Sequence, residues 1–92
     1  MYLVRPTQRY RKAYKRISRG KDFSRGILEE IIDTLSRGET LATEYQDHQL
    51  SGEYKGCREC HLQYDLLLMY QIHEDALVLL LVNLGTHDDL FG

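Results

Sequence analysis

The spacing of apolar residues predicts a helix near the start of the chain. After Thr7, apolar side chains recur at helical spacing and basic residues fill the positions between them, the apolar set being Tyr10, Ala13, Tyr14 and Ile17. Thr7 can cap this helix because its hydroxyl can accept a hydrogen bond from a free backbone N–H of the first turn, and Gly20 can end it. Ahead of the helix, residues 2–4 form a short apolar stretch that predicts an edge strand closed by Pro6.

A second apolar stripe follows at the same spacing and is made of Phe23, Ile27, Leu28, Ile31, Ile32 and Leu35. Asp22 is the predicted N-cap of this second helix, and Gly38 is its predicted end. Because the connection between the two amphipathic helices is short, we expect an antiparallel helix hairpin.

Beyond Gly38 the helical period disappears. Residues 39–53 follow neither period and predict a long ordered loop, whereas residues 54–62 alternate as a strand does. Apolar runs at 66–72 and 77–84 are of strand length, with turns at 63–65 and 73–75. The three strands predict an antiparallel meander whose near-continuous aliphatic character requires cover on both faces. The helix hairpin covers one face, and residues 86–91 form a C-terminal turn over the sheet.

These elements together predict an α+β fold, a helix hairpin packed on a small antiparallel sheet. A chain of 92 residues with 42% hydrophobic content builds one modest core, so residues 1–92 are expected to form a single domain. The first residues carry arginines where a secretory signal needs an apolar segment. The longest apolar run, 76–82, is far shorter than the roughly 20 residues that cross a bilayer. We therefore expect a soluble, cytoplasmic protein with no membrane partner.

The net charge of −2 hides a strong asymmetry. Residues 1–26 carry nine Lys or Arg and one acidic residue, whereas the remainder carries three Lys or Arg and thirteen acidic residues. A basic first third on an otherwise acidic protein is typical of a surface that faces a polyanion. Lys12, Lys15 and Arg16 are the residues expected to face RNA or the ribosome. On charge alone, a solvated helix face without a partner is an equally good interpretation.

The two cysteines match a haem-attachment pattern, Cys57-x-x-Cys60-His61. Against haem, the chain shows no export signal, and residues three apart on a strand point to opposite faces. A zinc site would need a second pair of ligands, and a thioredoxin-like pair belongs at a helix N-terminus. We therefore interpret both as ordinary cysteines of the sheet. No cofactor and no metal are expected, so the purified protein should show no Soret band.

The histidines are a stronger signal. Three of the four, His48, His61 and His87, fall in loop or strand-end positions. Imidazole titrates near neutrality, so two imidazoles can act as base and acid in one turnover. Strand alternation would place Lys55, Glu59 and His61 on one face and Arg58 on the other. Imidazoles, a carboxylate and a lysine on one surface suit RNA cleavage, in which a base deprotonates the ribose 2′-OH, an acid protonates the leaving 5′-oxygen and a cation stabilises the phosphorane.

Several short motifs follow one another in the second half of the chain. They are DHQLSG at 47–52, KGCRECH at 55–61, DLLLMY at 65–70 and GTH at 85–87, followed by Leu90 and Phe91. In order and spacing they resemble the YafQ branch of the RelE/ParE toxin superfamily, and the helix hairpin fits that family's layout. The resemblance implies a RelE-like fold and a type II toxin that cleaves mRNA on the ribosome. Its implied partners are a cognate antitoxin, the ribosome and mRNA.

The resemblance also implies site residues. The catalytic set would be His48, His61, Asp65 and His87, with Phe91 helping to hold the nucleotide. Family members commonly carry an arginine where this chain has Asn83, which can bind a phosphate oxygen but brings no charge. Lys55 is then the expected replacement for the missing cation. The alternative is an interaction protein of the same fold without nuclease activity, either a gyrase poison like the ParE branch or an inactive toxin that still binds antitoxin.

Overall fold

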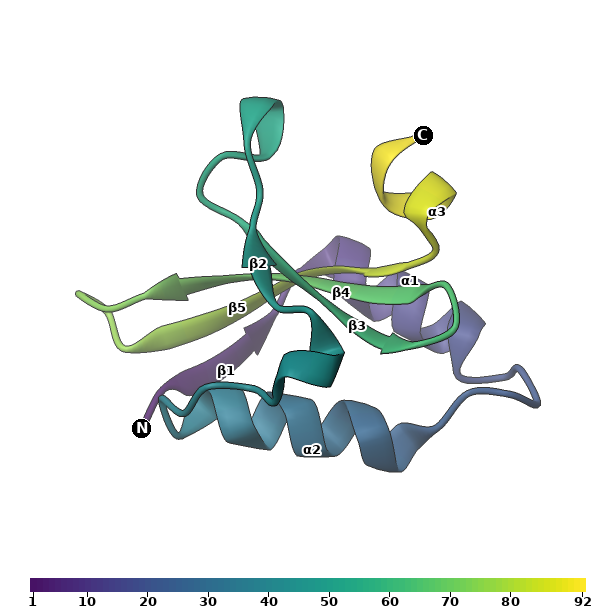
Figure 1. Ribbon diagram of the computed structural model, residues 1–92, viewed down its shortest axis with the longest axis horizontal. Coiled ribbons are helices and arrows are strands. Elements are labelled where there is room, and N and C mark those ends of the chain that lie inside the picture. The colour runs from purple at the N-terminus through teal and green to yellow at the C-terminus, as the bar shows by residue number, and fades with distance from the viewer.

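The computed structural model describes residues 1–92 and contains a five-stranded sheet with strand order β1-β5-β4-β3-β2 (Figure 1). Along the chain the elements are β1 (Leu3–Pro6), α1 (Gln8–Ile17), α2 (Arg25–Ser36), the 3₁₀ helix η1 (Thr43–Tyr45), β2 (His48–Gln49), the 3₁₀ helix η2 (Gly52–Tyr54), β3 (Arg58–Gln63), β4 (Leu66–His73), β5 (Val78–Gly85) and α3 (His87–Phe91).

The predicted meander is confirmed, because β3, β4 and β5 pair antiparallel in sequence order. The α+β class is confirmed as well. The sheet is nevertheless mixed, since β1 pairs parallel with β5, with Leu3 opposite Val78. The predicted sheet was purely antiparallel because the meander pattern concerns only consecutive strands. Two strands separated by most of the chain can pair in either direction.

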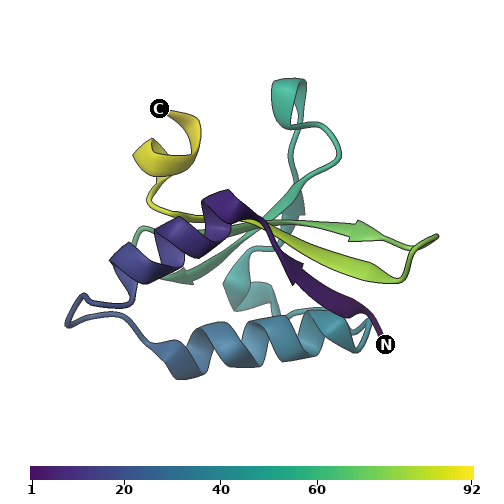
Figure 2. The same cartoon turned by 180° about the vertical axis from the view of Figure 1, so that it is seen from behind.

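The start of α1 is fixed to the sheet by Thr7, the predicted cap. Its hydroxyl accepts a hydrogen bond from the Tyr10 N–H at 3.0 Å and donates to the Val82 carbonyl at 2.7 Å. Since the Thr7 N–H also bonds the Leu81 carbonyl, α1 continues the line of β1 along the edge of β5. Figure 2 shows α1 at the level of this edge, with α2 on one side of the sheet and α3 on the other.

The predicted start of α2 and the predicted end of α1 need correction, whereas the predicted end of α2 is confirmed. The N-cap of α2 is Ser24, whose hydroxyl accepts from the Ile27 N–H, and not Asp22. The backbone carbonyl of Asp22 accepts a hydrogen bond from the Gln63 side chain. At the other end, Gly38 follows α2 with φ of +77°, the left-handed conformation expected of a glycine that ends a helix. The first helix ends at Ile17, before Gly20.

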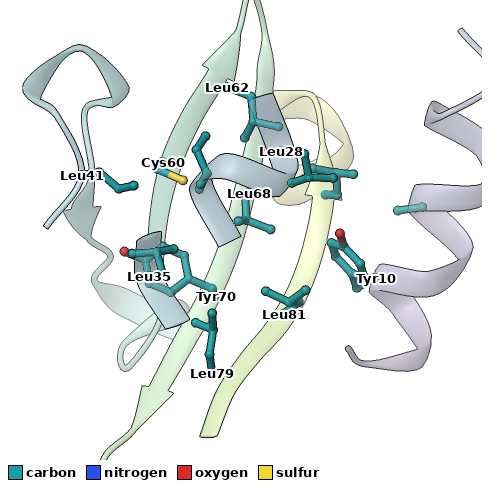
Figure 3. Close-up of a cluster of buried hydrophobic side chains, with 13 residues drawn as sticks. Tyr10, Leu28, Leu35, Leu41, Cys60, Leu62, Leu68, Tyr70, Leu79 and Leu81 are labelled. Carbon is teal, nitrogen blue, oxygen red and sulfur yellow. The ribbon is translucent and has the colours of Figure 1, made fainter. Parts of the chain in front are cut away.

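The core lies on both faces of the sheet, as the aliphatic strands predicted. A cluster of thirteen buried residues fills the space between the sheet and the two long helices, including Leu28, Leu68, Tyr70 and Leu81 (Figure 3). On the opposite face a smaller cluster of four residues, Cys57, Leu67, Met69 and Leu90, lies under η2 and α3. None of the helices is long and apolar enough to cross a bilayer.

A β-bulge in β5 sets the direction of Asn83. Met69 pairs with Asn83 and Tyr70 with Leu81, so Val82 is an extra residue in the strand. Leu81 belongs to the large core cluster, and uninterrupted alternation would turn Asn83 to that same face. The bulge restores Asn83 to the face of Met69, the face that carries η2 and α3.

The strand predicted from residue 54 begins only at Arg58. Residues 52–54 form η2, and Gly56 adopts a φ of +97°, which reverses the chain before the strand starts. Lys55 is the C-cap of η2 and lies outside β3. The alternation argument that placed Lys55 on the histidine face is therefore wrong, whereas Glu59 and His61 do belong to one strand.

Candidate active site

The face of the sheet that carries η2 and α3 also carries two of the predicted histidines. His48 on β2 pairs with Glu59 on β3, and His61 follows two residues later on the same strand. The Nε2 atom of His48 lies 3.2 Å from Oε1 of Glu59, and Nε2 of His61 lies 3.8 Å from the same oxygen. The two imidazole centroids are 6.2 Å apart. One carboxylate therefore stands between two imidazoles.

His48 is held at both ring nitrogens. Its Nδ1 atom lies 2.7 Å from the carbonyl oxygen of Gln46, a residue in the left-handed conformation with φ of +51°. Because both nitrogens face oxygen acceptors, the neutral ring can donate to only one of them, whereas the protonated ring donates to both. The arrangement fixes the orientation of the ring and accommodates the imidazolium that would form on accepting a proton.

Glu59 was predicted on the histidine face but lies outside the predicted catalytic set. It is only 2% exposed, and its Oε2 atom has no hydrogen-bond partner in the protein. A buried carboxylate costs free energy unless it is paired, so its retention beside two histidines points to a role in the site. The available signal was its position two residues before His61 on a predicted strand. That pattern alone does not distinguish it from a solvent-exposed glutamate.

A hydrogen-bond network on the other side of β3 supports the position of His48. Asp47 accepts hydrogen bonds from the guanidinium of Arg58, at 3.3 and 3.4 Å, and from the hydroxyl of Tyr70. Burial, assisted by the Asp47 carboxylate, raises the pKa of the Tyr70 hydroxyl above its ordinary value, so Tyr70 remains a donor. Since Asp47 directly precedes His48, this network anchors the short strand β2 to the core.

The other predicted residues gather at the N-terminus of α3. Thr86 and Asp89 form a reciprocal capping box that starts this helix directly after β5. The backbone N–H of His87 donates to Oδ1 of Asp65 at 3.3 Å, which joins α3 to the turn between β3 and β4. The rings of His87 and Phe91 lie 5.1 Å apart on the surface of α3. Asp65, His87 and Phe91 are therefore one group.

The loop that contains η2 packs against α3. The ring of Tyr54 meets that of Phe91 edge-on at a centroid distance of 5.1 Å, and the Tyr54 hydroxyl donates to the Leu90 carbonyl at 3.2 Å. This contact brings the C-terminal residues over the small apolar cluster and holds Phe91 in place. Tyr54 was expected in a strand, and its part in positioning Phe91 was not predicted.

The two groups are brought to one face but not into contact. No hydrogen bond or ring contact joins the pair His48 and His61 to His87. His61 pairs with Leu67, and Leu67 pairs with Gly85, so β4 separates His61 from the strand that leads to His87. At about 4.8 Å between neighbouring strands, the separation from β3 to β5 is about 10 Å. Leu67 and Met69 form an apolar floor between a group on β2 and β3 and a group on α3.

Asn83 and Lys55, the predicted substrate-binding pair, are in different places. Asn83 is 8% exposed, and its Oδ1 atom accepts a hydrogen bond from the Leu84 N–H at 2.9 Å. Its side chain lines a pocket formed with α1 and α3. Lys55 is exposed at the end of η2. The predicted RNA surface divides as well, because Lys12 and Arg16 line the pocket of Asn83 and Lys15 does not.

The cysteines lie on opposite faces of the sheet, as their spacing predicted. Cys57 belongs to the small cluster under η2, and Cys60 belongs to the large cluster on the helix side. Both are free thiols, and burial raises the pKa of Cys60 to about 12. Cys60 therefore stays protonated at neutral pH and serves as an apolar core residue.

The group on β2 and β3 also has the composition of a metal site. His48, Glu59 and His61 offer three ligand atoms within 4.8 Å of one another. Imidazole nitrogens and a carboxylate oxygen suit zinc or copper. Proton transfer would use the same imidazole nitrogens. A nitrogen that binds a metal cannot accept or donate a proton, so metal binding and proton transfer exclude each other at any one moment.

Comparison with known families gives a match over nearly the whole chain. Residues 2–92 match the family described as bacterial toxin of type II toxin-antitoxin system, YafQ. A toxin of this name from Haemophilus influenzae is 61% identical over 31 residues, which cover 34% of this chain and 30% of that protein. The mRNA interferase toxin YafQ of Escherichia coli K12 is 38% identical over 52 residues, covering 56% of this chain and 54% of that protein. The matched segments thus span a third to a half of these relatives.

Solved structures match over their full length. A metal-bound toxin from Helicobacter pylori is 37% identical and superimposes with a TM-score of 0.91, covering 99% of this chain and 100% of that one. The toxin in the Escherichia coli DinJ-YafQ complex is 25% identical, with a TM-score of 0.86 and full coverage of both chains. The arrangement of one sheet between α2 and α3 is therefore shared with solved toxins.

Proposed function

The chain belongs to the YafQ family of toxins from bacterial type II toxin–antitoxin systems, and from this premise we propose that it is an endoribonuclease that cleaves mRNA on the translating ribosome. Residues 1–92 would act as one toxin domain in the cytoplasm. The observation that carries the proposal is the pair of imidazoles at one buried carboxylate on an open sheet face, with a third histidine beside an aromatic ring on α3.

The proposed reaction is attack of a ribose 2′-OH on the adjacent phosphate. One histidine accepts the proton of the 2′-OH, the new P–O bond closes a 2′,3′-cyclic phosphate, and the P–O5′ bond breaks. A second histidine donates a proton to the departing 5′-oxygen, so no proton is consumed overall. The two histidine groups lie on either side of the apolar floor of Leu67 and Met69, and such an arrangement would suit a base and an acid on opposite sides of one phosphate.

The roles of the supporting residues follow from their contacts. Glu59 would orient His48 and His61 and balance the charge of an imidazolium, because its Oε1 atom faces both rings. Asp65 would fix the start of α3, and with it His87, through its bond to the His87 N–H. Phe91 would stack on or confine a base of the substrate, since Tyr54 holds its ring in place.

Metal independence is a prediction of this mechanism. Cleavage should persist in EDTA, because proton transfer between imidazoles requires no ion. A transition metal bound by His48, Glu59 and His61 would act as a Lewis acid, and it would occupy nitrogens that the proposed transfers need. Added stoichiometric Zn²⁺ should therefore suppress cleavage, and EDTA should restore it. Loss of activity in EDTA that returns with Zn²⁺ would show the opposite dependence.

The partners are proposed from the family and from the surface. The Escherichia coli toxin is described in a complex with DinJ, and we propose that this chain likewise binds a cognate antitoxin. The exposed basic residues Lys12, Lys15 and Arg16 on α1 suit ribosomal RNA or mRNA as a further partner.

A primer-extension assay on mRNA in a reconstituted translation reaction tests the function directly. Addition of the protein should produce new cleavage ends only when ribosomes translate the message. The double variant His48→Ala and His61→Ala should abolish these ends, whereas His73→Ala should not, because His73 lies at the far end of β4 and its side chain bonds that of Gln71. If the wild type produces no ends but still binds antitoxin, the protein is an interaction module of the same fold.

A further inference from the structure

We infer that the groove between α1 and α3, lined by Arg9, Lys12 and Arg16 beside Asn83, binds a backbone phosphate of the RNA next to the one that is cleaved. The inference rests on the proposed nuclease function and extends it, because it assigns a subsite and the residues that hold it. It also replaces Lys55 as the expected source of the positive charge that Asn83 lacks.

The groove is a defined pocket of about 580 Å³ with an unusual lining. Three of its six lining residues are cationic, one is the acidic Asp89, and the remaining two are Ala13 and Asn83. Arg9, Lys12 and Arg16 are spaced three and four residues apart, so they form one stripe along α1. Like charges at this spacing destabilise a helix, and α1 contains no acidic residue to offset them. The stripe therefore gains no ion pair within α1 and is available to an anionic ligand.

Asn83 connects this groove to the histidines. The β-bulge at Val82 places Asn83 on the open face, where it pairs with Met69, and Met69 pairs with Glu59. Glu59 pairs in turn with His48, so one row across the sheet leads from the groove to the histidine pair. At about 4.8 Å per strand, Asn83 lies about 10 Å from Glu59. A short stretch of single-stranded RNA spans such a distance, so one strand can occupy both places.

Two contacts prepare the groove for an anion. The Leu84 N–H bonds Oδ1 of Asn83, which leaves the amide nitrogen as the end of the side chain that can donate to a ligand. Arg16 faces Asp89 at 3.7 Å, a long and exposed ion pair that contributes little to stability. Asp89 is already held by the backbone N–H of Thr86 in the capping box. The guanidinium of Arg16 can therefore exchange this contact for two phosphate oxygens without disturbing α3.

Asp89 keeps a partner of its own when Arg16 turns to a ligand. The hydrogen bond from the Thr86 backbone lowers the pKa of the Asp89 carboxyl, and the neighbouring Arg16 lowers it further. Asp89 thus stays ionised and remains bound to the N-terminus of α3. RNA is favoured over an acidic peptide as the ligand because the groove is continuous, through the row of Asn83, Met69 and Glu59, with the face that carries the proposed chemistry.

The test compares two double variants with equal loss of charge. Arg9→Ala with Arg16→Ala removes two groove cations, and Arg11→Ala with Arg19→Ala removes two exposed cations, one on α1 and one just after it, that do not line the groove. The probe is a fluorescent, fully 2′-O-methylated RNA oligonucleotide, which lacks the attacking hydroxyl and so reports binding alone. The groove variant should bind at least about tenfold more weakly and lower the slope of log K against log salt by about 1, whereas the control should change little.

A gain-of-charge variant provides the complementary arm. Asn83→Arg in the groove double variant should recover a large part of the lost affinity, because it places a guanidinium at the floor of the same pocket. Equal losses in the groove and control variants, or no recovery with Asn83→Arg, would overturn the inference. Circular dichroism and thermal melting identify any variant that fails to fold. In that case the single variant Arg16→Lys takes its place, because lysine retains the positive charge but lacks the planar guanidinium group.

The remaining outcomes separate this inference from the proposed function. If the groove variants bind the RNA probe normally but lose antitoxin, the groove is an antitoxin surface and the inference fails. If the wild type binds the probe through the groove but never cleaves mRNA on ribosomes, the nuclease proposal fails and the RNA site stands. Normal cleavage with groove-independent binding would overturn the groove inference alone.

Discussion

Replacing His87 with alanine is expected to lower the rate of mRNA cleavage by about 10²-fold or more, the scale on which an acid or base contributes to catalysis. His87 is exposed on the first turn of α3, and its ring lies 5.1 Å from that of Phe91. Its backbone N–H, which bonds Asp65, is retained in the alanine variant. The melting temperature should therefore change little. Single-turnover cleavage on programmed ribosomes gives the rate, and differential scanning calorimetry gives the stability.

His73→Ala is the matched control for this experiment. His73 is also exposed and bonds only the side chain of its neighbour Gln71, at the end of β4 remote from α3. Its removal should leave the cleavage rate within about twofold of the wild type, because it contributes neither proton nor position to the site. If His87→Ala cleaves normally, or if it unfolds, His87 has a structural role and the acid–base assignment must move to His48 and His61.

The fold was predictable where local signals determine it and less so where distant contacts decide. The hydroxyl of Thr7, the glycine at position 38 and the aliphatic strands act within a few residues, and each prediction is confirmed. Ser24 caps α2 in place of Asp22, and the side chain of Gln63, 41 residues from Asp22, bonds both the Asp22 carbonyl and the Ser24 N–H. The parallel pairing of β1 with β5 likewise depends on a contact between the two ends of the chain.

The candidate site likewise combines features that local sequence signals predict with features that contacts between distant residues determine. His48, His61 and His87 were identified from residue type and from the spacing that resembles the family. The structure places all three on the side of the sheet that carries η2 and α3. Three features determine how the site is assembled and leave no clear mark in the sequence. The bulge at Val82 turns Asn83 to the face that carries η2 and α3. Gly56 ends the loop before β3 and so removes Lys55 from the strand. The pairing of His48 with Glu59 buries a carboxylate between two rings. Each depends on strand register, which alternation alone cannot supply.

Glu59→Gln is expected to lower the cleavage rate by on the order of 10²-fold while leaving stability unchanged within about 1 kcal/mol. Glutamine keeps the shape of the side chain and one oxygen that can face His48 and His61, but it removes the negative charge that balances an imidazolium. The Oε2 atom of Glu59 has no partner, so the folded protein loses no hydrogen bond there. Removing a buried charge also removes its desolvation cost, which offsets the weaker contact with the two rings.

A purely structural glutamate would give a different set of results. If Glu59 positions the histidines, kcat should fall with little change in KM, because substrate contacts are untouched. The ¹⁵N NMR signals of the imidazoles should also change at His48 and His61, which lie within 4 Å of the carboxylate, and stay constant at His73. Asp33→Asn is a matched control, since Asp33 is an exposed carboxylate on α2 that pairs only with Arg37. A variant Glu59→Gln that cleaves at the wild-type rate with altered histidine signals would show that the reaction does not depend on this pair of imidazoles, and the chemistry would then lie with His87 and Asp65.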